Sequence, residues 1–337
     1  MRLTGYDLSG MKLPFRVNDL LLLVVVLSSM AAGIIFPHFS SLFQALPIYC
    51  LMVLFSLSYL SIELDTVWRT LKDHSRTILT FTVLKSLILP VVVFYLFKVF
   101  APTYALSALL LTGVSTGVVA PFISNLIRGN SPLVLVVVVI TSVLVPITLP
   151  ALIQVVAAKY AEISLIAMVR MLVLVIFVPI LVVEGLRRLT PNLLKHLMKR
   201  QFPLSLLLFA IINLGIFCRY SPLFKKEPII IIMAFAVAVV LSVICCTVGI
   251  LFFWKSSVEN QLAGAVMLGN MNNVLVIVFS SEFFGPIEPM VAAMYIIPFF
   301  GLVMPLRYYS HRRTRAIDGI RRSQEKVLFN KGKGEAK

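Results

Sequence analysis

Apolar helices are interrupted at two places by the stretches TGVSTG (residues 112–117) and GNMNN (residues 269–273). The first glycine of each stretch precedes a turn glycine, Gly129 or Gly285, by the same 16 positions. Glycine and small polar residues in the middle of a membrane helix loosen its hydrogen-bond ladder, and the freed backbone groups are tolerated only against protein or a water-filled cavity. Two breaks in one register therefore predict two symmetry-related helices that share a site. Close packing of small residues is the alternative explanation for either stretch taken alone.

The chain around these stretches is too apolar to form a water-soluble surface. Of its 337 residues, 60% are hydrophobic and 13% are charged. A bilayer is spanned by about 20 apolar residues in a helix. Runs of this kind recur at 18–36, 41–62, 77–99, 103–128, 131–153, 162–186, 202–219, 228–254, 260–284 and 288–308. The sequence thus predicts an all-α, polytopic membrane protein with ten transmembrane helices.

The basic residues predict how these helices are oriented. With ten spans, 23 of the 30 Lys and Arg residues fall on the side that holds both termini, and five fall on the other. Cytoplasmic segments carry such an excess, so we expect both termini in the cytoplasm and a location in a bacterial inner membrane. The net charge of +16 then reflects orientation rather than a nucleic-acid partner. The arginines beside the last span are expected to contact anionic membrane lipids.

The two breaks fall in the fourth and ninth apolar runs, which are five apart. A unit with an odd number of spans, repeated along the chain, inserts with opposite topology. We therefore expect two inverted five-helix repeats at 18–153 and 162–308. A cytoplasmic N-terminal segment at 1–17 and a basic cytoplasmic tail at 309–337 flank them.

Two cations, Lys85 and Arg170, lie inside the expected spans. A charge at this depth is costly, so an intramembrane ionisable residue is a functional candidate by default. The alternative for both residues is snorkelling of the long side chain toward the membrane surface.

The motifs around the breaks resemble those of the bile acid:sodium symporter family, within the bile/arsenite/riboflavin transporter superfamily. Gly129-Asn130 matches the family's turn after the fourth helix, and Met271-Asn272-Asn273 resembles its Met-Gln-Asn in the ninth. Ser124-Asn125 resembles its Ser-Asn pair if one helical turn is deleted before the turn glycine. The resemblance implies that the broken fourth and ninth helices cross. It also implies a core (spans three to five and eight to ten) and a panel (one, two, six and seven), with substrate entering between them.

Several positions depart from the sodium-coupled pattern of that family. Leu268 stands where sodium-coupled members carry a carboxylate, and Val134 and Val138 stand where they carry hydroxyl ligands. Hard cations need several oxygen ligands, so this set is poor for sodium. Lys85 lies five residues before Pro90, where relatives often have a glutamine ligand. The resemblance therefore implies a divergent bacterial-type member in which a fixed ammonium replaces the ion.

We expect secondary transport of a small organic anion, because cations beside amide and hydroxyl donors complement a carboxylate. Coupling is then absent or carried by a proton on Lys85, rather than by sodium. The sequence contains no catalytic set, phosphate-binding loop or metal-ligand spacing, so it predicts no enzyme activity, cofactor or metal. A ligand-binding membrane sensor and a passive facilitator of the same fold are the alternatives. The expected substrate-binding residues are Ser115, Thr116, Gly117, Asn125, Asn270, Asn272, Asn273 and Arg170.

Overall fold

The computed structural model describes residues 17–60, 62, 64–157, 163–190, 194, 197–310 and 312–313. The expected N-terminal segment, apart from Val17, and nearly all of the basic tail lie outside these ranges. Within them the regular structure is helical, apart from one isolated β-bridge. The helices are α1 (Val17–Ile35), α2 (Pro37–Ser40), η2 (Ser41–Phe43), α3 (Pro47–Tyr59), α4 (Leu64–Asp73), α5 (Ser75–Val83), η3 (Leu84–Ile88), α6 (Leu89–Phe100), η4 (Pro102–Tyr104), α7 (Ala105–Gly113), α8 (Ala120–Leu126), α9 (Ser131–Val156), α10 (Leu165–Leu189), α12 (Gln201–Phe217), α13 (Ser221–Lys226), α14 (Ile229–Phe252), α15 (Val258–Gly269), α16 (Asn273–Phe283), α17 (Ile287–Met294) and α18 (Ile296–Gly301).

Five helical runs in the described part are long and apolar enough to cross a membrane, and a sixth is added if the bent pair α1–α2 counts as one span. The exposed faces of these runs carry large apolar side chains such as Val155 and Leu181. Such a surface is stable against lipid but not against water. The protein is therefore an all-α integral membrane protein. The five runs are Ser75–Phe100, Ser131–Val156, Leu165–Leu189, Ile229–Phe252 and Ile287–Ser310.

The four other expected spans contain helices that are broken or are shorter than the helices that cross a membrane. Two of them, α3 and α12, are apolar helices of 13 and 17 residues. The other two are broken: α7 ends before α8 begins, and α15 ends before α16 begins. The count of ten transmembrane helices therefore stays a prediction.

Turn and cap residues set where the helices after these interruptions begin. The side-chain oxygen of Asn130 accepts a hydrogen bond from the backbone N–H of Leu133 and caps α9. Asn272 does the same for α16 through the N–H of Leu275. Asparagine is favoured at this position because its side chain satisfies one of the otherwise unpaired N–H groups at a helix start.

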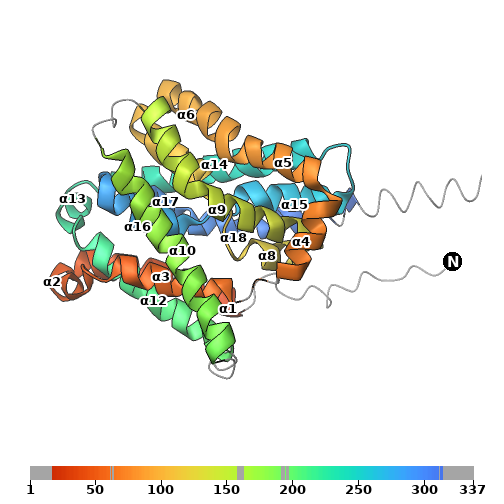
Figure 1. Cartoon of the computed structure of the whole chain (residues 1–337). Coiled ribbons are helices and arrows are strands. Elements are labelled where there is room, and N and C mark those ends of the chain that lie inside the picture. The colour runs from red at the N-terminus through yellow and green to blue at the C-terminus, as the bar shows by residue number, and fades with distance from the viewer. Residues whose placement is uncertain are drawn as a thin grey trace, which may run out of the picture.

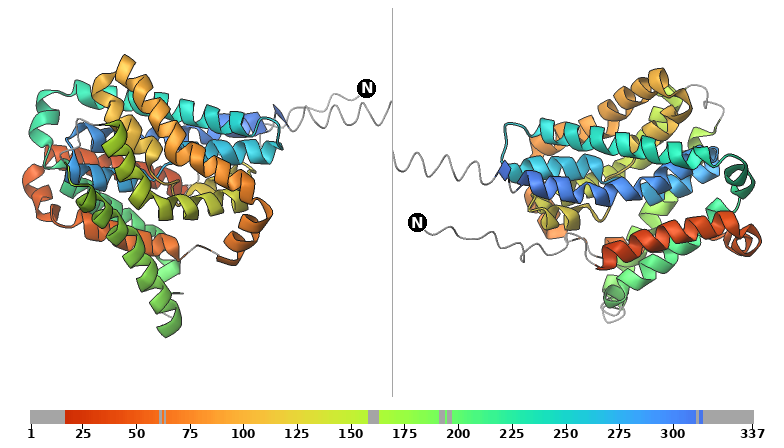
Figure 2. Two further views of the ribbon diagram at one scale, coloured as in Figure 1. Left: turned by 45° about the horizontal axis from the view of Figure 1, so that its top comes forward. Right: turned by 180° about the vertical axis from the view of Figure 1, so that it is seen from behind.

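The long helices form two groups. The helices α1, α3, α10 and α12 pack on one another and are called the panel helices below. The core helices are α5 to α9, including η3, and α14 to α18. In Figure 1, α2 and α13 lie at the left end of the bundle and α4 lies at the right end. Seen from behind, α1 and α12 lie side by side below the layer of α14 to α18 (Figure 2, right).

Candidate functional site

The two helix breaks lie against each other inside the core helices. The N–H of Gly117 donates to the carbonyl of Asn270 at 2.7 Å, and the N–H of Asn272 donates to the carbonyl of Ser115 at 3.0 Å. Thr116 and Met271 consequently form an antiparallel bridge. Unwound backbone inside a membrane must find partners other than water. The two breaks supply those partners to each other.

Neighbouring hydroxyl groups hold the crossing in place. The Thr116 hydroxyl donates to the carbonyl of Met267 at 2.8 Å, while its backbone N–H donates to the Thr141 hydroxyl at 3.1 Å. On the other break, the buried Tyr295 hydroxyl donates to the carbonyl of Gly269 at 2.7 Å. These contacts tie the first break to α9 and to the last turn of α15, and they tie the end of α15 to the last helical run. The geometry of the crossing is therefore fixed by several elements at once.

Gly117 occupies a position where a side chain does not fit. A Cβ atom there would stand 2.5 Å from Oδ1 of Asn270 and 3.0 Å from the carbonyl oxygen of Met271. The Asn270 amide can rotate away, but the Met271 carbonyl belongs to the paired backbone. Glycine at this position is what allows the two breaks to touch.

Several buried polar atoms at the crossing have no hydrogen-bond partner within the described structure. They are Oγ of Ser115, both amide atoms of Asn270 and Nδ2 of Asn272. The three side chains are between 1% and 8% exposed. Buried polar groups are almost always paired in folded proteins, so each exception needs an explanation. A polar ligand at the crossing would satisfy these donors and acceptors together.

Lys85 is fully buried beside this crossing. It lies in η3, a π-helical turn, and Pro90 follows five residues later. Proline has no N–H and its ring clashes with the carbonyl four residues earlier, so a widened turn is the local solution. The Lys85 ammonium donates to the carbonyl of Thr112 at 3.5 Å. That carbonyl is at the C-terminal end of α7, where the helix dipole favours a cation.

Comparison with known proteins identifies the family. A profile of the sodium bile acid symporter family matches residues 47–244. The chain belongs to the sodium bile acid symporter family. The match starts at α3 and ends within α14, so it contains Lys85 and the first break but not the second. Members of this family are membrane transporters rather than enzymes, and membership indicates a transporter here. No curated protein gives a significant match to the chain.

The family name raises the question of whether these residues fit a sodium ion. The positions that the resemblance leads us to expect as sodium ligands carry Leu268, Val134 and Val138, whose side chains are at most 2% exposed. Their side chains have no oxygen atoms. A hard cation with six or more oxygen ligands is not supported by this set. The buried cation among the described residues near the crossing is the Lys85 ammonium.

A small apolar cavity of about 40 Å³ separates the panel helices from the first break. Val118 from the break and Val138 from α9 line its core side, and Phe55 and Ile176 line its panel side. Ligand pockets usually measure about 300–1,000 Å³, so the cavity is too small for an organic solute. A solute can reach the break from this side only if the panel and core helices move apart.

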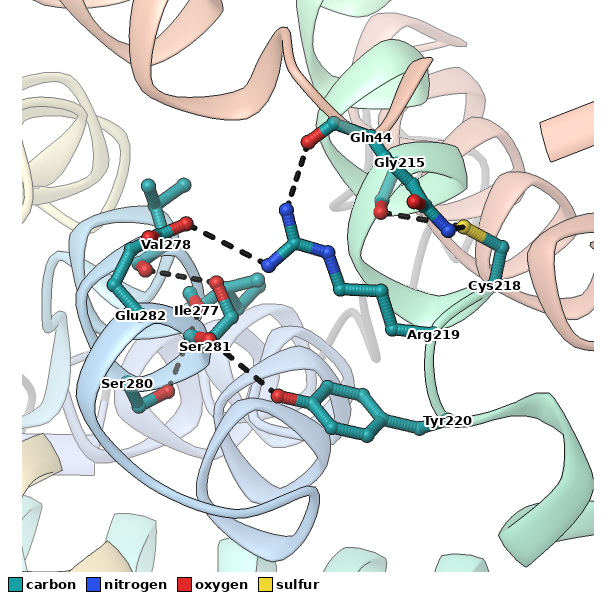
Figure 3. Close-up of polar contacts among 10 residues, drawn as sticks. All are labelled: Gln44, Gly215, Cys218, Arg219, Tyr220, Ile277, Val278, Ser280, Ser281 and Glu282. Carbon is teal, nitrogen blue, oxygen red and sulfur yellow. Dashed lines mark hydrogen bonds and ion pairs between the residues drawn. The ribbon is translucent and has the colours of Figure 1, made fainter. Parts of the chain in front are cut away.

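Polar contacts close the panel helices onto the core at the end that holds α2 and α13 (Figure 3). An ion pair joins Arg219, after α12, to Glu282 near the end of α16, with N and O atoms 3.7 Å apart. Arg219 also donates to the carbonyl of Gln44 at 2.8 Å. The Tyr220 hydroxyl donates to the carbonyl of Ser281 at 3.5 Å. Burial raises the pKa of Tyr220, which keeps this donor protonated. We call these contacts the latch.

The structure brings together some of the sequence-predicted residues and leaves others apart. Ser115, Thr116, Gly117, Asn270 and Asn272 meet at the crossing. Asn273 is adjacent but donates to the carbonyl of Ala292 at 3.4 Å.

Two other predicted residues are not part of this cluster. Asn125 and Arg170 are exposed on α8 and α10. No hydrogen bond joins their side chains to the crossing within the described structure.

Sequence reasoning missed Glu288, in the first turn of α17. This carboxyl is 5% exposed, and its Oε2 atom has no hydrogen-bond partner in the described part of the chain. It lies within electrostatic range of Tyr220 in the latch. The sequence signal for Glu288 is an acidic residue at the start of an apolar run, directly before Pro289.

Proposed function

We propose that this protein is a secondary transporter of a small carboxylate-bearing solute, which binds at the crossing of the two breaks. The observation that carries the proposal is the group of unpartnered atoms on Ser115, Asn270 and Asn272. All three side chains offer amide or hydroxyl donors to an anion. Asn272 also caps α16, an 11-residue helix whose N-terminal end favours negative charge.

Lys85 supports the choice of an anion. Its ammonium is buried and has a single hydrogen bond, to a neutral carbonyl, among those found in the described structure. A buried cation without a counterion is costly, and a substrate carboxylate would offset that cost. The apolar cavity at Val118 favours a solute that carries hydrocarbon next to its carboxylate.

The transport cycle that we propose is alternating access between the panel and core helices. The breaks at corresponding positions of the two halves support a ten-helix arrangement with inverted repeats at 18–153 and 162–308. Both α7 and α15 end at the glycines that lie 16 positions before Gly129 and Gly285. The site would stay with the core helices while the panel helices uncover it from one side and then the other.

We also propose that both termini lie in the cytoplasm of a bacterial cell, because basic residues are concentrated on their side. Leu42, at the α2 end, is 74% exposed, and Ser256 is exposed between α14 and α15. The four native cysteines are buried. An impermeant thiol reagent applied to intact cells should label Leu42→Cys but not Ser256→Cys. The reverse pattern would invert the orientation.

Uptake into proteoliposomes tests the proposed function. The purified protein is reconstituted and offered a panel of radiolabelled mono- and dicarboxylates, with matched amides as neutral controls. We expect uptake of at least one carboxylate and of none of the amides. Accumulation above equilibrium under a proton gradient indicates coupling through a protonatable group. Equilibration alone indicates a facilitator, which the lack of ion ligands at Leu268, Val134 and Val138 also allows. Uptake of the amides in preference to the acids would contradict an anion site.

The latch should control access to the crossing from the end of the bundle that holds α2 and α13. Arg219 and Glu282 are about one third exposed, with side-chain exposures of 35% and 32%. A pair of this kind contributes at most about 1 kcal/mol. Replacing Arg219 with Gln should therefore speed labelling of a Val118→Cys probe by an impermeant reagent up to about fivefold.

Lys225→Gln is the matched control, because Lys225 lies at the same end but donates to the carbonyl of Ile35 within the panel side. The exchange of Arg219→Glu with Glu282→Arg should restore the slow labelling. Equal labelling rates in Arg219→Gln and Lys225→Gln would show that the latch does not close the path.

A further inference from the structure

A second cavity, which is polar, lies away from the crossing, between the end of α8 and the end of the last helical run. It measures about 200 Å³ and is lined by Leu126, Ile127, Arg128, Arg307 and Ser310. Since a water molecule takes about 30 Å³, the cavity has room for a group of several heavy atoms. Its position is separate from the substrate site proposed above.

Arg128 enters this cavity from a backbone conformation that arginine rarely adopts. Its φ is 64°, the one positive value recorded for a non-glycine residue in the described chain. The N–H of Gly129 bonds to the carbonyl of Ser124, and that of Arg128 bonds to the carbonyl of Asn125. This is the Schellman pattern, in which glycine is usual at the position of Arg128. Arginine there costs free energy that the helix end alone does not require.

Arg307 faces the same cavity from the opposite side. Its Nε donates to the carbonyl of Leu126 at 3.3 Å. The two terminal nitrogens of its guanidinium are not used in that bond. In the described structure the ion pairs involve Arg187, Arg188 and Arg219, and neither cavity arginine takes part in one. Two guanidinium groups that have no carboxylate partner among the described residues thus face one polar space.

Aromatic residues place this cavity near the depth of lipid headgroups. Arg313 stacks over the rings of Trp254 and Tyr309, at 5.2 and 5.7 Å. Trp254 is 55% exposed, and Tyr308 is 67% exposed. Trp and Tyr gather at the membrane–water interface. Ser310, which lines the cavity, directly follows Tyr309 in the chain.

We propose that this cavity is a phosphate-binding site, with Arg128 and Arg307 as a pair of guanidinium ligands at the membrane surface. Guanidinium forks match the oxygen geometry of a phosphate group and bind it with two parallel hydrogen bonds. The headgroup of an anionic phospholipid is the source that the aromatic residues favour. Free phosphate from the cytoplasm has the same chemistry.

The experiment uses the full-length protein in two arms. In the first, native mass spectrometry measures how much phosphatidylglycerol the protein retains when it is released from mixed phosphatidylglycerol–phosphatidylcholine nanodiscs. In the second, inorganic phosphate is titrated against the thermal stability of the protein in a non-ionic detergent, with chloride at equal ionic strength as reference. The variants are Arg128→Gly, Arg307→Gln and Arg312→Gln. Glycine suits the backbone at position 128, so Arg128→Gly should remain folded.

We expect Arg128→Gly and Arg307→Gln each to weaken retention of phosphatidylglycerol about tenfold or more, the usual cost of losing a charge-assisted pair. Arg312→Gln removes an equal charge nearby but outside the cavity, and any loss of lipid in this variant should be well below the loss in the two cavity variants. A phosphate-specific rise in melting temperature that Arg128→Gly abolishes would identify free phosphate as the ligand of the same site. Equal behaviour of all three variants and the wild type in both arms would overturn the proposal. An equal loss in Arg312→Gln would also overturn it, since it would indicate unspecific attraction.

Discussion

Replacing Gly117 with valine should abolish transport while leaving the protein in the membrane. The Cβ of any larger residue would stand 3.0 Å from the Met271 carbonyl, inside the paired backbone of the two breaks. Forcing extra carbon atoms into such a position typically costs 1–3 kcal/mol and shifts the backbone. A shift of this size would separate Asn270 and Ser115, whose unpartnered atoms form the proposed site. Uptake into proteoliposomes, with melting temperature measured in parallel, checks this prediction.

Gly185 is the matched control for Gly117. A Cβ at this position of α10 would meet nothing within 4 Å. Gly185→Ala should therefore transport like the wild type, while Gly117→Ala should already lose most activity. If Gly117→Val transports normally, the contact between the breaks is not needed for function and the site must lie elsewhere.

Replacing Lys85 with glutamine should reduce uptake of the carboxylate by about tenfold or more. A hydrogen bond to a charged group contributes about 1.5–3 kcal/mol, and glutamine cannot supply the charge. Stability should not fall, because Lys85 is fully buried and its recorded partner is the neutral Thr112 carbonyl. Removing an uncompensated buried charge is neutral or stabilising. Initial rates of uptake and thermal melts of the two proteins measure both effects.

Arg170 provides a matched control for Lys85. Both are cations inside expected spans, but Arg170 is exposed on α10, where its side chain can snorkel. Arg170→Gln should transport nearly as well as the wild type. If Lys85→Gln and Arg170→Gln are equally active, then the buried ammonium has no part in binding or coupling.

The glycines that stand 16 positions before Gly129 and Gly285 predicted where the broken helices end, because backbone conformation follows local sequence. The helices α7 and α15 end at Gly113 and Gly269, the first glycines of the two stretches. Which side chains stay unpartnered could not be predicted in the same way. Thr116 and Ser115 are chemically similar neighbours, yet the Thr116 hydroxyl bonds to Met267 and the Ser115 hydroxyl has no partner among the described residues.

The sequence also did not predict the contacts between distant segments. The latch pairs Arg219 with Glu282, two residues that the sequence places only near the ends of two separate expected spans, 202–219 and 260–284. Arg170 looked equivalent to Lys85 because both interrupt apolar runs. Packing separates them: a widened turn before Pro90 directs Lys85 into the core helices, whereas α10 presents Arg170 to its outer face. Such differences depend on which helix faces are covered, and one sequence does not contain that information.

Sodium titration of thermal stability tests whether the Lys85 ammonium stands where relatives hold their ion. The purified protein is melted in increasing sodium chloride and, at equal ionic strength, in potassium chloride. A folded protein that binds sodium gains about 2.7 kcal/mol at 100 times the dissociation constant. We predict superimposable curves for the two salts in the wild type. A sodium-specific rise in melting temperature would show that a sodium site exists despite Leu268, Val134 and Val138, and would contradict the replacement of the ion by Lys85.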